Sequence, residues 1–203
     1  MEDTIVLIDS AFLSKISKYL SKGKHLVYDI IKLAENLSIR LNLNCKKIFY
    51  ATAPPFQGTP PTKNELNRKI RYDKFISKLK KNPLIKIEEG RVQKIKKSDG
   101  KIVYSQKGVD TILIMRLSFA PIDFPNVKKI ILVSSDTDFC PVIEELKSKG
   151  IDVILYSYHE KIRGTKFSIS NHLISCCSMY LKLTKKDFDD SPLKKLKRDE
   201  TKN

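Results

Sequence analysis

The feature that most constrains the fold of this chain is an apolar run that ends near a pair of aspartates. Residues 129–133 are mostly aliphatic and β-branched, which is typical of a strand buried on both faces of a parallel sheet. A helix is predicted over residues 142–150, with Pro141 tolerated because it falls in the first turn. Asp136 and Asp138 therefore lie at the carboxyl end of a strand, where ligands bind in open α/β sheets.

The pair of aspartates has two interpretations. Two carboxylates at one such position are costly unless a cation or a cationic substrate neutralises them. Alternatively, Asp136 and Asp138 only cap the following helix and interact favourably with its dipole. The motif alone leaves both interpretations open.

Two further aspartates follow apolar segments or precede helical ones. A predicted strand over residues 4–9 ends in an aspartate, and another aspartate stands just before the apolar helical stretch 111–117. Hard divalent cations such as Mg²⁺ take oxygen ligands from a few carboxylates and keep several waters. If the fold brings the aspartates together, they suit such a cation. The candidate ligands are Asp9, Asp110, Asp136 and Asp138.

The segments that carry these aspartates resemble the NYN domain family, the LabA-like group of the PIN-like nuclease superfamily. The resemblance covers about residues 4–183 and is carried by the motifs VLIDS, KGVDTILI and ILVSSDTDF. It implies a doubly wound α/β/α sandwich with a mainly parallel five-stranded sheet, whose clustered aspartates hold Mg²⁺ or Mn²⁺ and cleave RNA. By this resemblance, the catalytic and metal-binding residues would be Asp9, Asp110, Asp136 and Asp138.

Three positions depart from the family pattern. The family usually has an asparagine where this chain has Phe12, often an aspartate in place of Arg116, and a glycine in place of Ser135. The candidate metal ligands are therefore present without their usual polar neighbours. Two functions remain open: a metal-dependent ribonuclease, and a catalytically impaired RNA-binding or scaffold module on the same fold.

Arg116 bears on the choice between these functions, because a guanidinium beside the aspartates could displace a metal or hold a phosphate. On a helix that starts near Asp110, a residue six positions later lies about 240° around the axis. The two side chains then occupy different faces. We predict an ion pair or a phosphate contact at the edge of the site, rather than a direct block.

Most of the positive charge lies in the middle of the chain. The net charge is +16, and residues 63–107 contain 15 basic and 5 acidic residues. A basic band beside a metal site suits a phosphodiester, because cations bind the RNA backbone while the metal contacts the scissile phosphate. The alternative is a lysine-rich solvated surface. The candidate RNA contacts are Arg68, Arg71, Lys94, Lys96, Lys107 and Arg116.

The remaining pattern predicts one domain over residues 1–184 and a disordered charged tail over residues 185–203. Further strands are predicted over residues 45–52, 84–88 and 151–156, and further helices over residues 11–20, 25–43, 64–81 and 168–183. In the helix over residues 64–81, the side chains expected to face inward are Leu66, Ile70, Ile76 and Leu79.

A β-hairpin insertion is predicted over about residues 91–106, around a Ser-Asp-Gly turn. Tyr104 could stack on a base, but we expect it to pack within the hairpin, as cross-strand aromatic residues commonly do. The proline-rich residues 53–61 are expected to form an exposed loop on the same rim as Asp9.

The cysteines and histidines argue against a disulfide-rich protein and against a zinc site. The four cysteines form no CxxC pair and no disulfide framework, and the three histidines lack zinc-ligand spacing.

No apolar stretch approaches the length of a membrane span, and the acidic start does not resemble a signal peptide. We expect a cytoplasmic protein that binds RNA, single-stranded or structured, and no membrane. The sequence leaves homo-oligomerisation open.

Overall fold

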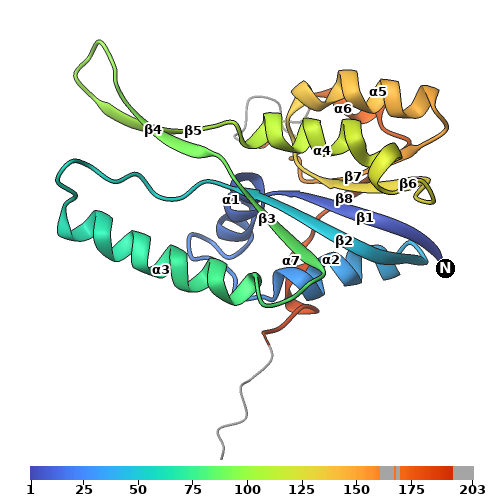
Figure 1. Ribbon diagram of the computed structural model, residues 1–203, viewed down its shortest axis with the longest axis horizontal. Helices are drawn as coiled ribbons and strands as arrows, with labels where there is room; N and C mark the ends of the chain where they lie inside the picture. Colours follow the sequence, from blue (N-terminus) through green and yellow to red (C-terminus); the bar gives the residue numbers. More distant parts are fainter. Residues whose placement is uncertain (161–166, 168–169, 194–203) are drawn as a thin grey trace, which may run out of the picture.

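The chain folds around a parallel sheet with helices on both faces. The computed structural model describes residues 1–160, 167 and 170–193, and these form a six-stranded sheet in the order β3-β2-β1-β6-β7-β8. Each neighbouring pair of strands in it is parallel. An antiparallel hairpin, β4–β5, projects beyond the sheet (Figure 1). The strand order reverses between β1 and β6, and the carboxyl ends of the strands at such a switch point commonly form a binding crevice.

The elements follow the predicted alternation of strands and helices. The strands of the sheet are β1 (Glu2–Asp9), β2 (Leu43–Thr52), β3 (Ile85–Glu89), β6 (Lys129–Val133), β7 (Asp152–Ser157) and β8 (Met179–Lys182). The hairpin consists of β4 (Arg91–Lys96) and β5 (Ile102–Lys107). The helices are α1 (Ser10–Leu20), α2 (Ile30–Ile39), α3 (Lys63–Leu79), α4 (Val109–Asp123), α5 (Cys140–Ser148), α6 (Asn171–Cys176) and α7 (Lys185–Asp189), with a 3-10 turn η1 (Thr137–Phe139) before α5. Within the described ranges, none of the helices combines the length and apolarity needed to cross a bilayer.

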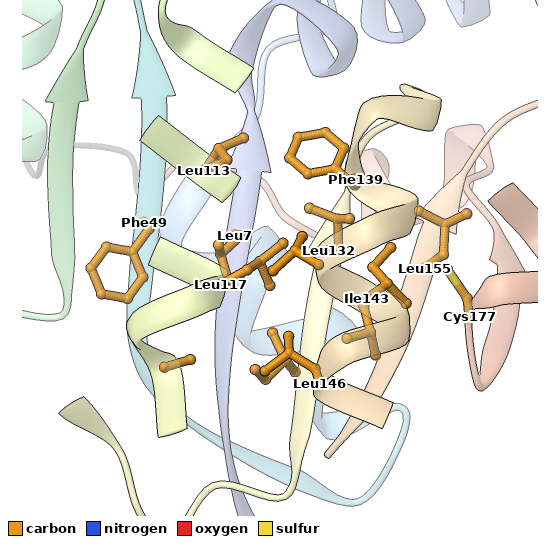
Figure 2. Packing of buried hydrophobic residues seen from close by; sticks show 14 of the residues in the cluster. Leu7, Phe49, Leu113, Leu117, Leu132, Phe139, Ile143, Leu146, Leu155 and Cys177 are labelled. Carbon is orange, nitrogen blue, oxygen red and sulfur yellow. The ribbon is translucent and has the colours of Figure 1, made fainter. Parts of the chain in front are cut away.

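Two apolar layers hold the helices to the sheet, because successive side chains of a strand point to opposite faces. On one face, Leu7 and Leu132 pack with residues of α4, α5 and α6 (Figure 2). On the other face, Ile8 and Val133 pack with residues of α1, α2 and α7 and the end of α3. The central strands β1 and β6 are therefore buried on both faces, which explains their uninterrupted apolar sequence.

The predicted doubly wound α/β fold is confirmed, with one strand more than the five expected. The helix predicted over residues 168–183 is confirmed over residues 171–176 and wrong beyond them: α6 ends at Cys176, Cys177 is extended, and β8 then pairs with β7 in parallel. Residues 168–169 lie outside the described residues. A four-residue strand at the sheet edge has too short an alternation to be distinguished from a helix by sequence pattern.

Two helices differ from their predicted extent or orientation. The helix predicted from residue 25 begins at Ile30, because the Asp29 side chain caps it by accepting the backbone N–H groups of residues 31 and 32. In α3, Ile76 and Leu79 are buried as expected, but Leu66 and Ile70 are 46% and 51% exposed. The first turns of α3 extend past the sheet edge, so their apolar side chains have no core to face (Figure 1).

The predicted charged tail begins with structure. Residues 185–189 form α7, and the buried ring of Phe188 packs edge-on against Tyr28, with ring centroids 4.8 Å apart. The backbone carbonyl of Ser191 accepts the N–H of Asp29 at 2.8 Å. The expected disorder is therefore wrong for residues 185–193, while residues 194–203 lie outside the described part.

The predicted hairpin is present and is fixed at its base. Gly90 donates its backbone N–H to the carbonyl of Thr52 at 2.8 Å, which ties the hairpin to the end of β2. A Cβ atom at Gly90 would lie only 2.5 Å from the carbonyl oxygen of Lys107, so a larger residue does not fit. After β5, Gly108 adopts φ +80° and turns the chain directly into α4.

Candidate functional site

Asp9 ends the central strand β1 and caps the helix that follows it. Its Oδ1 accepts hydrogen bonds from the backbone N–H groups of Ala11 at 2.9 Å and Phe12 at 3.2 Å. The residue is only 8% exposed. Burial raises the pKa of Asp9 to about 6, and the charges of Asp110 and Asp136 also act to raise it. Asp9 is therefore both a helix cap and a member of a group of carboxylates.

The paired aspartates follow β6, whose last residue is the register partner of Ile8 in β1. Asp136 is half-buried, and its Oδ1 accepts the backbone N–H of Asp138 at 3.0 Å. Asp138 is exposed and lies in η1, and α5 then begins at Cys140, two residues earlier than the helix predicted from residue 142. Asp136 therefore caps the 3-10 turn, whereas the capping interpretation had both aspartates capping the helix; α5 itself has Phe139 as its N-cap residue.

Asp110 reaches the same edge of the sheet from the hairpin side, in the first turn of α4. Burial raises the pKa of Asp110, and the charges of Asp136 and Asp138 raise it further. The fold thus brings the four predicted ligands into one group, close enough for their charges to interact. Their role as ligands remains a prediction.

The chemistry of this group fits a hard divalent cation, because all four side chains offer carboxylate oxygens. Across residues 1–160, 167 and 170–193, no three histidine, cysteine, aspartate or glutamate side chains are arranged to hold an ion by themselves. Mg²⁺ is usually held by one or two carboxylates, with waters and substrate phosphates as the other ligands.

A hollow of about 380 Å³ opens between two of these aspartates. Its lining residues are Asp9, Ala11, Phe12, Lys15, Ser135, Asp136 and Thr137. Phe12, which replaces the usual asparagine, is buried and packs with the apolar layer under α1. The position at which the resemblance predicts an asparagine thus contributes to core packing here.

Lys15 is the residue of this hollow that sequence reasoning missed. Its exposed side chain lies one helical turn after Ala11, on the face of α1 that borders the acidic group. Its ammonium group also lies 5.0 Å from the ring centroid of Phe167. Because α1 begins at Ser10, residues 11 and 15 are four positions apart on one helix face. That spacing could have placed Lys15 near the acidic group.

Arg116 does not lie among the aspartates. Its guanidinium pairs with Glu88, with Nη2 at 2.5 Å and Nε at 2.7 Å from Oε1, and it lies over the ring of Phe49. It is not among the charges that shift the pKa of Asp9 or Asp110. The structure therefore shows the ion pair, one of the two alternatives predicted for Arg116.

The other predicted RNA contacts separate by position. Arg68 and Arg71 are exposed on α3. In the hairpin, Lys94 is opposite Tyr104 and Lys96 is opposite Ile102, so these side chains share one face. Lys107 is opposite Arg91, and both alternate onto the other face of the hairpin.

The charge on Asp9 is expected to lower the stability of the metal-free protein. Because the pKa of Asp9 is raised from 3.8 to about 6, the folded state loses stability as pH rises between these values. Asp9→Asn keeps the oxygen that accepts the two N–H groups and removes the charge. At 1.36 kcal/mol per pKa unit, it should raise the free energy of unfolding at pH 7 by about 3 kcal/mol.

Urea denaturation in EDTA at pH 7 and near pH 3, below the unfolded pKa, measures this gain, which should vanish at the lower pH. Asp123→Asn, the same change at an exposed site near the other edge of the sheet, should alter stability by no more than about 0.5 kcal/mol. A gain that is equal at both pH values would refute the buried charge as its cause.

Comparisons with known proteins agree with this fold. A family model described as NYN domain matches residues 3–184, a span that contains all four aspartates and the hairpin. A solved structure of a protein of unknown function from Vibrio parahaemolyticus RIMD 2210633 matches with a TM-score of 0.57 and 17% identity. That match covers 92% of this chain and 95% of the other, and it shows a similar fold alone. No curated protein matches the chain significantly.

Proposed function

The chain belongs to the NYN domain family of PIN-like nucleases, and from this premise we propose that it is a divalent-metal-dependent ribonuclease. The observation that supports the proposal most is the grouping of Asp9, Asp110 and Asp136 at the carboxyl edge of β1 and β6, with mutually raised pKa values for the first two. Carboxylates that are this costly to ionise together are stabilised by a bound cation.

Asp9 and Asp136 would hold Mg²⁺ or Mn²⁺ at the hollow, with Asp110 and Asp138 beside them. Such an ion lowers the pKa of a bound water and stabilises the charge that develops on the oxygens of the scissile phosphate. The backbone N–H groups of Ala11 and Phe12 orient the Asp9 carboxylate through one oxygen and leave the other for a ligand. Lys15, at the rim of the hollow, would contact a phosphate oxygen of the RNA.

Cleavage of labelled single-stranded RNA by the full chain tests the proposal. We expect cleavage with Mn²⁺ or Mg²⁺ and none in EDTA. Calorimetry should show that the parent binds Mn²⁺ without any change at Arg116, since that side chain is already paired with Glu88. Mn²⁺ binding that appears only in Arg116→Asp would contradict the proposal. RNA binding without cleavage in either metal would favour the alternative, a catalytically impaired RNA-binding module.

A further inference from the structure

A second concave surface lies beside the aspartates, between the hairpin, α3 and the loop after β2. This cleft has a volume of about 680 Å³, and its lining includes the aromatic residues Phe56, Tyr72 and Tyr104. Figure 1 shows the hairpin and α3 extending past the same edge of the sheet, with the loop between them. No step proposed above for cleavage uses this cleft.

The cleft opens at the same edge of the sheet as the acidic group. Ala53, in its lining, lies two residues beyond Ala51, which is the register partner of Asp9. On the hairpin side, Gln106 lines the cleft and lies four residues before Asp110. An RNA strand bound in the cleft would therefore continue toward the aspartates.

Of the two aromatic rings that meet at the hairpin, Tyr104 is exposed and Phe56 is half-buried. The ring centroids of Phe56 and Tyr104 are 5.5 Å apart with an interplanar angle of 48°, and Tyr104 is 46% exposed. The residue opposite Tyr104 on the other hairpin strand is Lys94, so its aromatic neighbour comes from the loop after β2 and not from the hairpin. Tyr104 instead contacts a ring of the loop, which leaves part of its own face available to a ligand.

One cation lines the cleft, and two more lie on the hairpin face that borders it. The ammonium group of Lys94 lies 5.7 Å from the ring centroid of Phe56, and Lys96 shares its face of the hairpin. Arg68 lines the cleft from α3 and forms no ion pair with any described residue. The nearby carboxylate of Glu65 is occupied in capping α3, where it accepts the N–H and the hydroxyl of Thr62. The cleft thus combines partly exposed aromatic rings with nearby positive charge.

We propose that this cleft binds single-stranded RNA, with a base stacked against Tyr104 and Phe56 and phosphates near Arg68 and Lys94. The inference rests on the proposed function in taking RNA as the ligand, and it adds the strandedness and the subsite. Grooves that combine aromatic rings with cations bind single strands because every unpaired base offers a π-face for stacking. In a duplex, the bases are stacked on one another, so no base face is available to the aromatic rings.

Affinity for a labelled oligo-uridine and for an RNA duplex of equal length tests the inference, in EDTA so that cleavage plays no part. Tyr104→Ala, alone and with Phe56→Ala, should lower single-strand affinity by about 10-fold or more for each ring removed. Duplex affinity and the salt dependence should not change, because no charge is lost. Tyr104→Phe should retain the affinity of the parent. Phe119→Ala, which removes a ring that is 48% exposed on α4 and outside the cleft, serves as the matched control.

A second pair of variants tests the phosphate contacts. Arg68→Gln with Lys94→Gln should lower the slope of log affinity against log salt by about 1.4, at about 0.7 for each phosphate contact on a single strand. Lys128→Gln with Lys149→Gln, two exposed lysines at the other edge of the sheet, should leave the slope unchanged.

Three results would overturn the inference: unchanged single-strand affinity in Tyr104→Ala, equal losses for single strand and duplex, or no RNA binding by the parent, as expected if the cleft binds a protein. Tyr104 lies on the exposed hairpin, so its variant remains informative even if Phe56→Ala unfolds the loop. Ring-dependent binding by a parent that fails to cleave RNA with Mn²⁺ would uphold the cleft and refute the nuclease. If the parent cleaves RNA with Mn²⁺ and Tyr104→Ala changes neither cleavage nor single-strand affinity, the nuclease is upheld and the cleft is refuted.

Discussion

Asp136→Asn is expected to lower metal-dependent cleavage of RNA by about 100-fold or more, since losing even an outer partner of a metal ligand typically costs 10- to 100-fold. The variant loses a charged oxygen ligand but keeps the carbonyl oxygen that accepts the N–H of Asp138 at 3.0 Å. The fold should therefore remain intact. The change also removes one of the charges that raise the pKa of Asp9 and Asp110.

Single-turnover rates in Mn²⁺ measure this effect, and thermal unfolding in EDTA checks that the variant is folded. Asp123→Asn makes the same chemical change at the end of α4, near the amino-terminal edge of the sheet, and should cleave at the parental rate. A parental rate for Asp136→Asn would remove this residue from the proposed metal site.

Phe139→Ala should lower the free energy of unfolding by about 3–5 kcal/mol, as truncation of a buried ring usually does. The ring is fully buried and packs in the same apolar layer as Leu113, Leu132 and Ile143 (Figure 2). Phe139 directly follows Asp138, so it also anchors the turn that carries the paired aspartates. We expect the folded fraction of the variant to bind metal more weakly, because this turn would be less constrained.

Urea denaturation of the parent and the variant measures the loss of stability. Phe119→Ala provides the control, because the same truncation of a half-exposed ring on α4 should change stability by no more than about 0.5 kcal/mol. A loss below about 1 kcal/mol for Phe139→Ala would show that its ring is not packed as described.

The parts of the fold that could be predicted are those with an unambiguous burial pattern. Residues 5–8 and 130–133 are apolar throughout, because both faces of β1 and β6 are covered, and a run of this kind indicates a central parallel strand. The edge strand β8 has half-buried residues and only four positions, so its pattern also suits a helix. The exposed start of α3 could not be predicted, since periodicity indicates an apolar face without showing how far the sheet reaches.

The same distinction applies to the site. The aspartates were identifiable because each stands at the carboxyl end of a strand or the start of a helix, and those ends meet at one edge in a parallel sheet. The partner of Arg116 was not identifiable, because Glu88 lies 28 residues earlier and approaches it only when α4 packs on β3. The position of Tyr104 beside Phe56 likewise depends on the path of the loop after β2, which has no periodic pattern.

The base of the hairpin has a thermodynamic consequence. Gly90 holds the first hairpin strand to the end of β2, and the second strand passes through Gly108 directly into the turn that contains Asp110. Because this connection is so short, a tilt of the hairpin on a bound strand would also displace Asp110. The two ligands would then be linked: a metal ion that strengthens RNA binding by some factor would itself be bound more tightly by RNA, by the same factor. Movement of the hairpin would thus couple the binding of RNA to the binding of the metal ion.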